Sequence, residues 1–182
     1  MEHMMIDIET LGTDPGAVIM SMAAVPFSLD GKRKEGKLWT IDIQSQLDEG
    51  LFISGETLTW WIGQKPELLS RQVKDSVPLR HALARFAQYI ETERSSSLWS
   101  HGSTFDIPIL GMAYRIVDFN VPWSYRGVRD TRTLFWLARL KGWDPVYAET
   151  PNDKHDPKAD AHRQITQVLA ALAVIEKGGP VE

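Results

Sequence analysis

Acidic side chains in three separate stretches of this sequence have the types and spacing of a cation site. Asp7 and Glu9 stand two residues apart in an apolar segment, and Asp106 opens an expected helix in the middle of the chain. His155 precedes Asp160 by five residues, at the start of the last expected helix. The chain has no cysteine, so a bound metal must be held by oxygen or imidazole. This donor set favours hard divalent cations.

The first acid pair falls on an expected strand. Side chains alternate along a strand, so Asp7 and Glu9 project from one face while Ile6 and Ile8 project from the other. Two neighbouring carboxylates repel each other unless a cation or solvent compensates. A metal site accounts for the pair, and so does the solvated face of an edge strand.

Each remaining residue also has a simpler explanation when it is taken alone. Asp106 is typical of a helix N-cap, and Asp160 is favoured by the dipole of a helix first turn. His155 alone is typical of an exposed loop. The joint arrangement is what favours a site: an acid pair on the first strand, one acid at a middle helix, and His-x-x-x-x-Asp at the last helix.

Length and composition are those of one globular domain that buries its own core. The chain has 182 residues, of which 43% are hydrophobic and 24% charged, with a net charge of −4. That charge argues against nucleic-acid binding through a broad basic surface, but it is compatible with a site that concentrates carboxylates. No apolar stretch is long enough to cross a bilayer, and we expect a cytoplasmic location without membrane association.

The elements expected to position these residues form a mixed α/β sheet flanked by helices. Segments Met4–Ile8, Val18–Phe27 and Leu38–Ile43 have the pattern of an antiparallel meander, and a further short strand covers Leu98–Ser100. Gly142–Pro157 lacks periodicity and is expected to be a mobile loop. Helices are expected over Thr57–Gln64, Pro78–Ile90, Asp106–Val117, Thr131–Leu140 and Lys158–Lys177.

Read together, these motifs resemble the DEDD exonucleases in their histidine-containing branch, DEDDh. The matching positions are Asp7-Ile8-Glu9-Thr10, Phe105-Asp106 and His155-x-x-x-x-Asp160. Within that branch the sequence looks most like the exonuclease of phages, the nuclease part of exodeoxyribonuclease VIII and a related bacterial exoribonuclease domain. Three segments support this: TLTWWIGQ from Thr57, PWSY from Pro122 and RDTRTL from Arg129. Gly102 stands where many DEDDh enzymes have an Asn, which puts the subfamily in question more than the chemistry.

The resemblance implies a ribonuclease H-like fold over residues 1–182, as a single DEDDh exonuclease domain. It implies two divalent cations, Mg²⁺ or Mn²⁺, bridged by Asp7 and shared among Glu9, Asp106 and Asp160, with His155 as general base. Such a pair of ions stabilises both the attacking and the leaving oxygen at phosphorus. The implied reaction is hydrolysis of phosphodiester bonds from the free 3′ end of single-stranded DNA or RNA, or of 3′ overhangs, in a bacterial or phage-infected cell.

Some residues beside this site are candidates for contact with the terminal nucleotide. Thr10 and Leu11 follow the acid pair, and Phe105 precedes Asp106, but loop or core packing explains each of them equally well. Trp60 and Trp61 face about 100° apart on a helix, so at least one is expected in the core.

Other charged and aromatic residues are expected outside the site. His162 points away from Asp160 on the last helix, and Asp130 is expected to fix neighbouring arginines. Four basic residues cluster around an expected turn: Lys32, Arg33, Lys34 and Lys37. We expect them either to form a solvated hairpin tip or to touch phosphates of the substrate. A homodimer with Trp123 or Trp136 at its interface is possible on the resemblance.

Two alternatives to the exonuclease stay open at this stage. One is a catalytically idle nucleic-acid-binding or assembly module of the same fold, and the other is an endonuclease of related fold. The four carboxylates and the histidine favour an enzyme, because a binding module does not need anions crowded against phosphate. The choice between DNA and RNA depends on contacts to the 2′-hydroxyl that the sequence does not reveal.

Overall fold

A five-stranded mixed sheet organises the protein. The computed structural model describes residues 1–64, 66–145 and 155–177. In the sheet the strand order is β3-β2-β1-β4-β5, where β1–β2 and β2–β3 are antiparallel and β4 and β5 run parallel to β1. The strands are β1 (His3–Thr10), β2 (Ile19–Phe27), β3 (Lys37–Thr40), β4 (Ser97–Ser100) and β5 (Val128–Asp130). The expected meander of the first three strands is confirmed.

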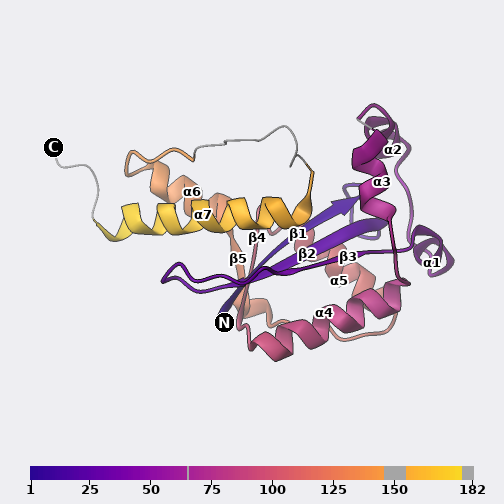
Figure 1. The fold of residues 1–182 in the computed structure, drawn as a ribbon, viewed down its shortest axis with the longest axis horizontal. Coiled ribbons are helices and arrows are strands. Elements are labelled where there is room, and N and C mark those ends of the chain that lie inside the picture. The colour runs from indigo at the N-terminus through magenta and orange to yellow at the C-terminus, as the bar shows by residue number, and fades with distance from the viewer. Residues whose placement is uncertain (65, 146–154, 178–182) are drawn as a thin grey trace.

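Helices cover both faces of this sheet (Figure 1). One face carries α4 (Leu79–Glu93) and α5 (Asp106–Ile116), and the other carries α6 (Thr131–Arg139) and α7 (Pro157–Glu176). Three shorter helices between β3 and α4 lie toward one end of the sheet: α1 (Ile43–Asp48), α2 (Gly55–Ile62) and α3 (Pro66–Val73). The mixed α/β architecture flanked by helices is the one that the sequence predicts. No described helix has the length and apolarity to span a membrane.

The alternation of side chains along β1 assigns the two faces their roles. Met4, Ile6 and Ile8 are buried in the core beneath α4 and α5. Met5 points to the opposite face and is buried in the second core, beneath α6 and α7. Because side chains alternate, Asp7 and Glu9 continue on the α7 side. The apolar pattern of one strand therefore directs both acids toward the last helix.

Packing beneath α4 makes Phe86 a strong test of the larger core. Its side chain is fully buried, and its ring meets Trp39 edge to face at 5.9 Å between centroids. We expect Phe86→Ala to lower the free energy of unfolding by about 3–5 kcal/mol, because it leaves a cavity in a close-packed core. Urea unfolding measures this loss. The half-exposed Phe119 provides the matched control, and a loss for Phe119→Ala as large as that for Phe86→Ala would contradict the assignment of the core.

Four short elements were not expected from the sequence: α1, α3, β5 and a 3-10 helix at Tyr125–Gly127. Several boundaries also differ from the expected ones, among them the end of the third strand. The third strand ends at Thr40 rather than Ile43, because Asp42 caps α1 by accepting a hydrogen bond from the backbone N–H of Ser45 at 2.7 Å. Helices α1 and α3, with six and eight residues, have too few turns for a clear apolar period, and β5 has only three residues. Most of the expected mobile loop, residues 146–154, lies outside the described part of the chain.

Candidate active site

Strand β1 and helix α7 bring three of the expected acids together. Asp7 and Glu9 project from β1 toward α7, whose first turn contains Asp160. One carboxylate oxygen from each residue lies within 4.8 Å of the others. Gln164, one turn further along α7, donates to Asp7 Oδ1 at 2.8 Å. The strand and the helix are thereby joined at the cluster itself.

Asp106 enters the same cavity from α5. It is the first residue of the helix, and Phe105 is the N-cap and makes no side-chain capping bond, so capping does not explain this acid. Its Oδ1 accepts from the backbone N–H of Ile8 at 3.3 Å, and its side chain is almost fully buried. A cavity of about 420 Å³ is lined by residues that include Asp7, Glu9, Asp106, His155 and Asp160. The structure thus places all five expected residues around one cavity.

His155 is held at the edge of the acid cluster by aromatic rings. Its Nδ1 lies 3.7 Å from Glu9 Oε1, and its side chain is 22% exposed. The imidazole meets Trp60 and Trp61 edge to face, with centroids 5.1 and 5.6 Å apart. Its Nε2 is buried without a hydrogen-bond partner among the described residues. The next residue, Asp156, caps α7, so the histidine is fixed next to a helix start.

Burial and crowding make the acids difficult to ionise. Burial raises the pKa of Asp7 well above its usual range, and the charges of Asp106, Glu9 and Asp160 raise it further. Burial raises the pKa of Asp106 to about 7, against hydrogen bonds from its own backbone N–H and that of Ile8, which lower it. Burial also raises the pKa of Asp160 to about 6, although the Arg163 guanidinium, 2.6 Å away, lowers it. Clustered carboxylates with raised pKa values are typical of a functional site, here one that a bound cation would complete.

The residues present fit divalent cations. The donors are carboxylate oxygens from separate elements, which are the ligands that Mg²⁺ and Mn²⁺ prefer. A cation among them offsets both the burial and the mutual repulsion that raise the pKa of Asp7. Asp7, Glu9 and Asp160 each place a carboxylate oxygen close enough to the others to bind one cation. Asp106 lines the same cavity from α5.

A rise in pH should lower the stability of the metal-free protein, and Mn²⁺ should raise it. Because burial raises the pKa of Asp106 and Asp160 in the native state, these groups hold more protons there than in the unfolded chain. Their stabilising contribution is complete below about pH 4, the pKa of an exposed Asp, and is lost as the pH rises. We expect the melting temperature of the metal-free protein to fall between about pH 5 and about pH 8, and Mn²⁺ to raise it more at the higher pH. Equal Mn²⁺ shifts at both pH values would contradict this linkage.

Several residues lining the cavity were not singled out from the sequence. Arg132, Arg163, His101 and Gln164 line it together with the acids. Gln164 and Arg163 stand four and three residues after Asp160, a helical spacing that places side chains on neighbouring faces and was a usable signal. The position of Arg132 follows from Gly102, whose backbone has a φ of +96° and leaves room for the guanidinium. No sequence spacing indicates that contact.

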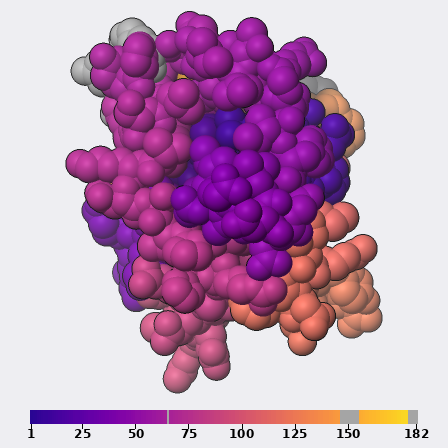
Figure 2. All heavy atoms as spheres, turned by 90° about the vertical axis from the view of Figure 1, so that its right-hand side faces the viewer, coloured from indigo at the N-terminus to yellow at the C-terminus, as the bar shows by residue number. Residues whose placement is uncertain are grey.

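A second pocket of about 420 Å³ adjoins the acid cavity through shared residues, among them Glu9 and Phe105. Thr10, Thr57, Trp60 and Phe105 line it. Figure 2 shows indigo atoms of the N-terminal segment at the floor of a recess bordered by purple and magenta atoms of the α1–α3 region. Thr10 and Phe105 both line this pocket, and the Thr10 hydroxyl donates to the Gly12 carbonyl at 2.6 Å. Leu11 does not line it, because its side chain is 2% exposed and belongs to the core.

The paired tryptophans divide as the helix geometry requires. Trp61 is 2% exposed and donates from Nε1 to the Thr10 carbonyl at 2.9 Å, whereas Trp60 is 46% exposed. The expectation that at least one belongs to the core is confirmed. Their shared contact with His155 was not expected.

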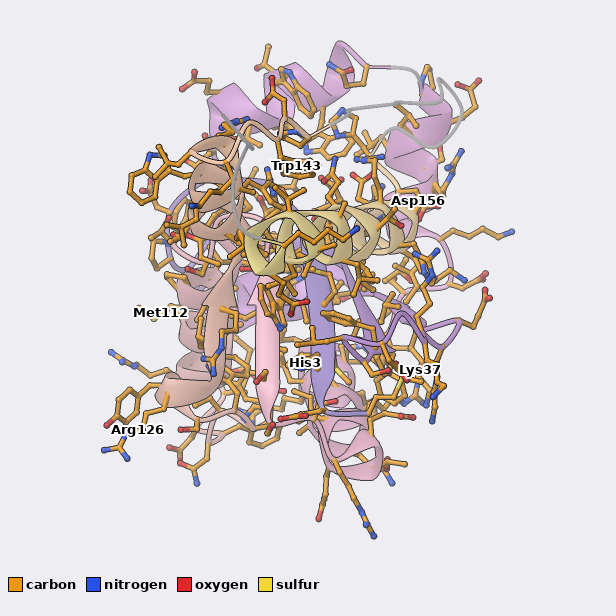
Figure 3. The ribbon with its side chains drawn as sticks, turned by 90° about the vertical axis from the view of Figure 1, so that its left-hand side faces the viewer. His3, Lys37, Met112, Arg126, Trp143 and Asp156 are labelled. Atoms are coloured by element: carbon orange, nitrogen blue, oxygen red, sulfur yellow. The ribbon has the colours of Figure 1, made fainter. Side chains whose placement is uncertain are left out.

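The residues expected outside the site do lie outside it. His162 Nε2 lies 3.0 Å from the Glu35 carbonyl. Asp130 caps α6 by accepting from the backbone N–H of Arg132, a contact to the backbone in place of the expected one to arginine side chains. The basic residues near the hairpin tip contact partners within the chain: Lys32–Asp30, Lys34–Glu93, Arg33–Thr166 and Lys37 over the Tyr89 ring. Lys37 lies at one edge of the sheet, opposite the edge that carries Arg126 (Figure 3). The contacts of Lys32, Arg33, Lys34 and Lys37 within the chain favour structural roles for these four residues.

Comparison with known proteins identifies the class that this fold and site define. The structure of the nuclease domain of 3′hExo, a DEDDh family member bound to rAMP, superposes with a TM-score of 0.58 at 14% identity, covering 99% of this chain and 94% of that one. The fold is that of the DEDDh nucleases. The profile of the 3′-5′ exoribonuclease Rv2179c-like domain matches residues 2–172, and the chain belongs to this family. The resemblance and fold inferred from the sequence are confirmed.

A curated relative agrees with this class over part of its length. An exodeoxyribonuclease of Enterobacteria phage T4 is 28% identical over 124 residues, which is 60% of this chain and 54% of the relative. The chain thus spans about half the length of that relative. The matching family is one of 3′-5′ exoribonuclease domains, and the acid cavity fits the chemistry of that class.

Proposed function

We propose that the protein removes nucleotides from the free 3′ end of single-stranded nucleic acid, or of 3′ overhangs, by hydrolysis assisted by two divalent cations. The observation that carries this proposal is the convergence of Asp7, Glu9 and Asp160 within 4.8 Å, beside the buried Asp106 and the histidine. Membership of a 3′-5′ exoribonuclease family supports the polarity.

The chain's own residues would divide the work as follows. Asp7, Glu9, Asp106 and Asp160 would hold Mg²⁺ or Mn²⁺, and these ions acidify water and neutralise charge at phosphorus. His155 would take a proton from the attacking water, since its Nε2 is unpartnered among the described residues and Trp60 and Trp61 fix its ring. Phe105 and Thr10, in the adjoining pocket, would contact the terminal nucleotide.

Matched oligonucleotides test the proposal. RNA and DNA of one sequence, labelled at the 5′ end, are incubated with Mn²⁺ and separated on a gel, beside copies whose 3′ end is blocked. We expect a ladder of products shortened from the 3′ end, no cleavage of blocked copies, and no activity with chelator. Internal cuts in blocked copies would show an endonuclease instead. Retention of full-length substrate by a folded protein would show the idle binding module.

The substrate class is proposed to include RNA, because the matching family is one of exoribonucleases, while the phage relative is named as an exodeoxyribonuclease. The rates of degradation of RNA and DNA in the same assay show which of the two is the preferred substrate. A cytoplasmic location stays a prediction.

A homodimer is proposed through α6. Trp136 is 57% exposed and lies beside Leu137 and Leu140, which are also exposed. Trp123, the other candidate, is only partly buried but packs against Phe86 and Tyr114 within the chain. Analytical ultracentrifugation of wild type and Trp136→Lys measures the oligomeric state, and the variant should be monomeric. A monomeric wild type would overturn the proposal.

A further inference from the structure

The backbone of His155 is held by a glutamine from a distant helix. Gln72 lies on α3 and is 2% exposed. Its side-chain amide donates from Nε2 to the carbonyl oxygen of His155. Its Oε1 accepts from the hydroxyl of Ser21, a fully buried residue on β2. A chain of two hydrogen bonds therefore joins the central sheet to the histidine.

The conformation of His155 explains why such a restraint is needed. Its φ is +58°, in the left-handed region that residues other than glycine seldom adopt. A conformation of this kind costs on the order of 1–3 kcal/mol and persists only where the surroundings impose it. An amide bond to the His155 carbonyl acts on that backbone directly. The buried position of Gln72 keeps water from competing for the same carbonyl.

A second contact from α3 reaches the next residue. Arg71 lies 3.7 Å from the carboxylate of Asp156, which also caps α7. Figure 3 shows Asp156 at the start of α7 and close to α3. Helix α2 adds the rings of Trp60 and Trp61 against the imidazole. Helices α2 and α3 together hold both the backbone and the ring of the histidine.

We propose that Gln72 is a positioning residue, which fixes the imidazole of His155 toward Glu9 by holding the His155 carbonyl through its side-chain amide. The inference rests on the proposed role of His155 as general base. Gln72 lines neither the acid cavity nor the adjoining pocket, so its loss should affect the orientation of the base and leave the cation ligands in place. Outer-shell partners of this kind change activity by about 10- to 100-fold when they are removed.

The test compares Gln72→Met with Gln46→Met. Both remove a buried amide that bonds to the backbone, since Gln46 accepts from the N–H of Ile19 and donates to its carbonyl. Both variants should lose stability. Only Gln72→Met should reduce kcat, by about tenfold, with KM and the Mn²⁺-induced thermal shift unchanged. Ser21→Ala, which removes only the anchor of Gln72, should give a smaller reduction of the same kind.

An NMR measurement without metal or substrate makes the inference independent of activity. The ring signals of His155, assigned by their absence in His155→Ala, should be displaced by the ring currents of Trp60 and Trp61. In Gln72→Met they should move toward the positions of a free histidine, and in Gln46→Met they should stay.

The outcomes separate this inference from the proposed function. Wild-type kcat and unshifted His155 signals in Gln72→Met would overturn the positioning role, whatever the substrate. Equal losses of kcat in Gln72→Met and Gln46→Met would also overturn it, because they would reflect stability alone. Full activity of His155→Ala would instead overturn the role of the histidine as base, while the NMR shift would still report whether Gln72 orients it.

Discussion

Asp7→Asn should abolish nuclease activity and make the metal-free protein more stable. Asp7 is central to the cluster, since burial raises its pKa and the charges of Asp106, Glu9 and Asp160 all raise it further. Losing one member of a group that acts as a unit costs on the order of 10⁴-fold in kcat. An amide of the same shape removes the repulsion between buried carboxylates, so the melting temperature above neutral pH should rise. Single-turnover assays and calorimetry measure the two effects.

The opposite signs of the two effects distinguish a cation site from an ordinary structural acid. The control is Asp75→Asn, which makes the same chemical change at an exposed position whose φ of +55° suits asparagine. It should leave both activity and stability near those of wild type. Reduced stability of Asp7→Asn, or activity within about tenfold of wild type, would show that Asp7 does not carry the role proposed for it.

His155→Ala should reduce kcat by about 10²- to 10⁴-fold, the contribution of a positioned general base. Since the four carboxylates remain, the thermal shift produced by Mn²⁺ should persist. His162→Ala is the matched control, because His162 lies on α7, seven residues after His155, and its Nε2 lies 3.0 Å from the Glu35 carbonyl. An equal loss in both variants, or loss of the Mn²⁺ shift in His155→Ala, would contradict the assignment of the base.

The sequence predicts the parts of this protein that follow from local periodicity. The alternation of Ile6 and Ile8 with Asp7 and Glu9 indicates a strand with one apolar and one acidic face, and the structure has this arrangement. The long apolar stripe of the last helix predicts α7 to within one residue at each end. Together these two elements position three of the acids.

Contacts between distant segments could not be predicted in the same way. The bond from Gln72 to His155 joins residues 83 apart, and nothing in the spacing of either residue signals it. The sequence left open whether Leu11 contacts a nucleotide or packs internally, and the structure buries it in the larger core. Gly102 signalled only a departure from a motif, while the structure shows the Arg132 guanidinium packed over it. Such features depend on how whole elements pack.

Diffraction from crystals soaked in Mn²⁺, recorded to locate anomalous scatterers, tests the central claim most directly. The account predicts anomalous peaks in the acid cavity, within about 2.0–2.3 Å of carboxylate oxygens as oxygen-ligated divalent cations require. Asp7 should contact every ion found there, and the peaks should disappear in Asp7→Asn. Peaks only at surface acids, or an acid cavity without anomalous density at saturating Mn²⁺, would contradict it.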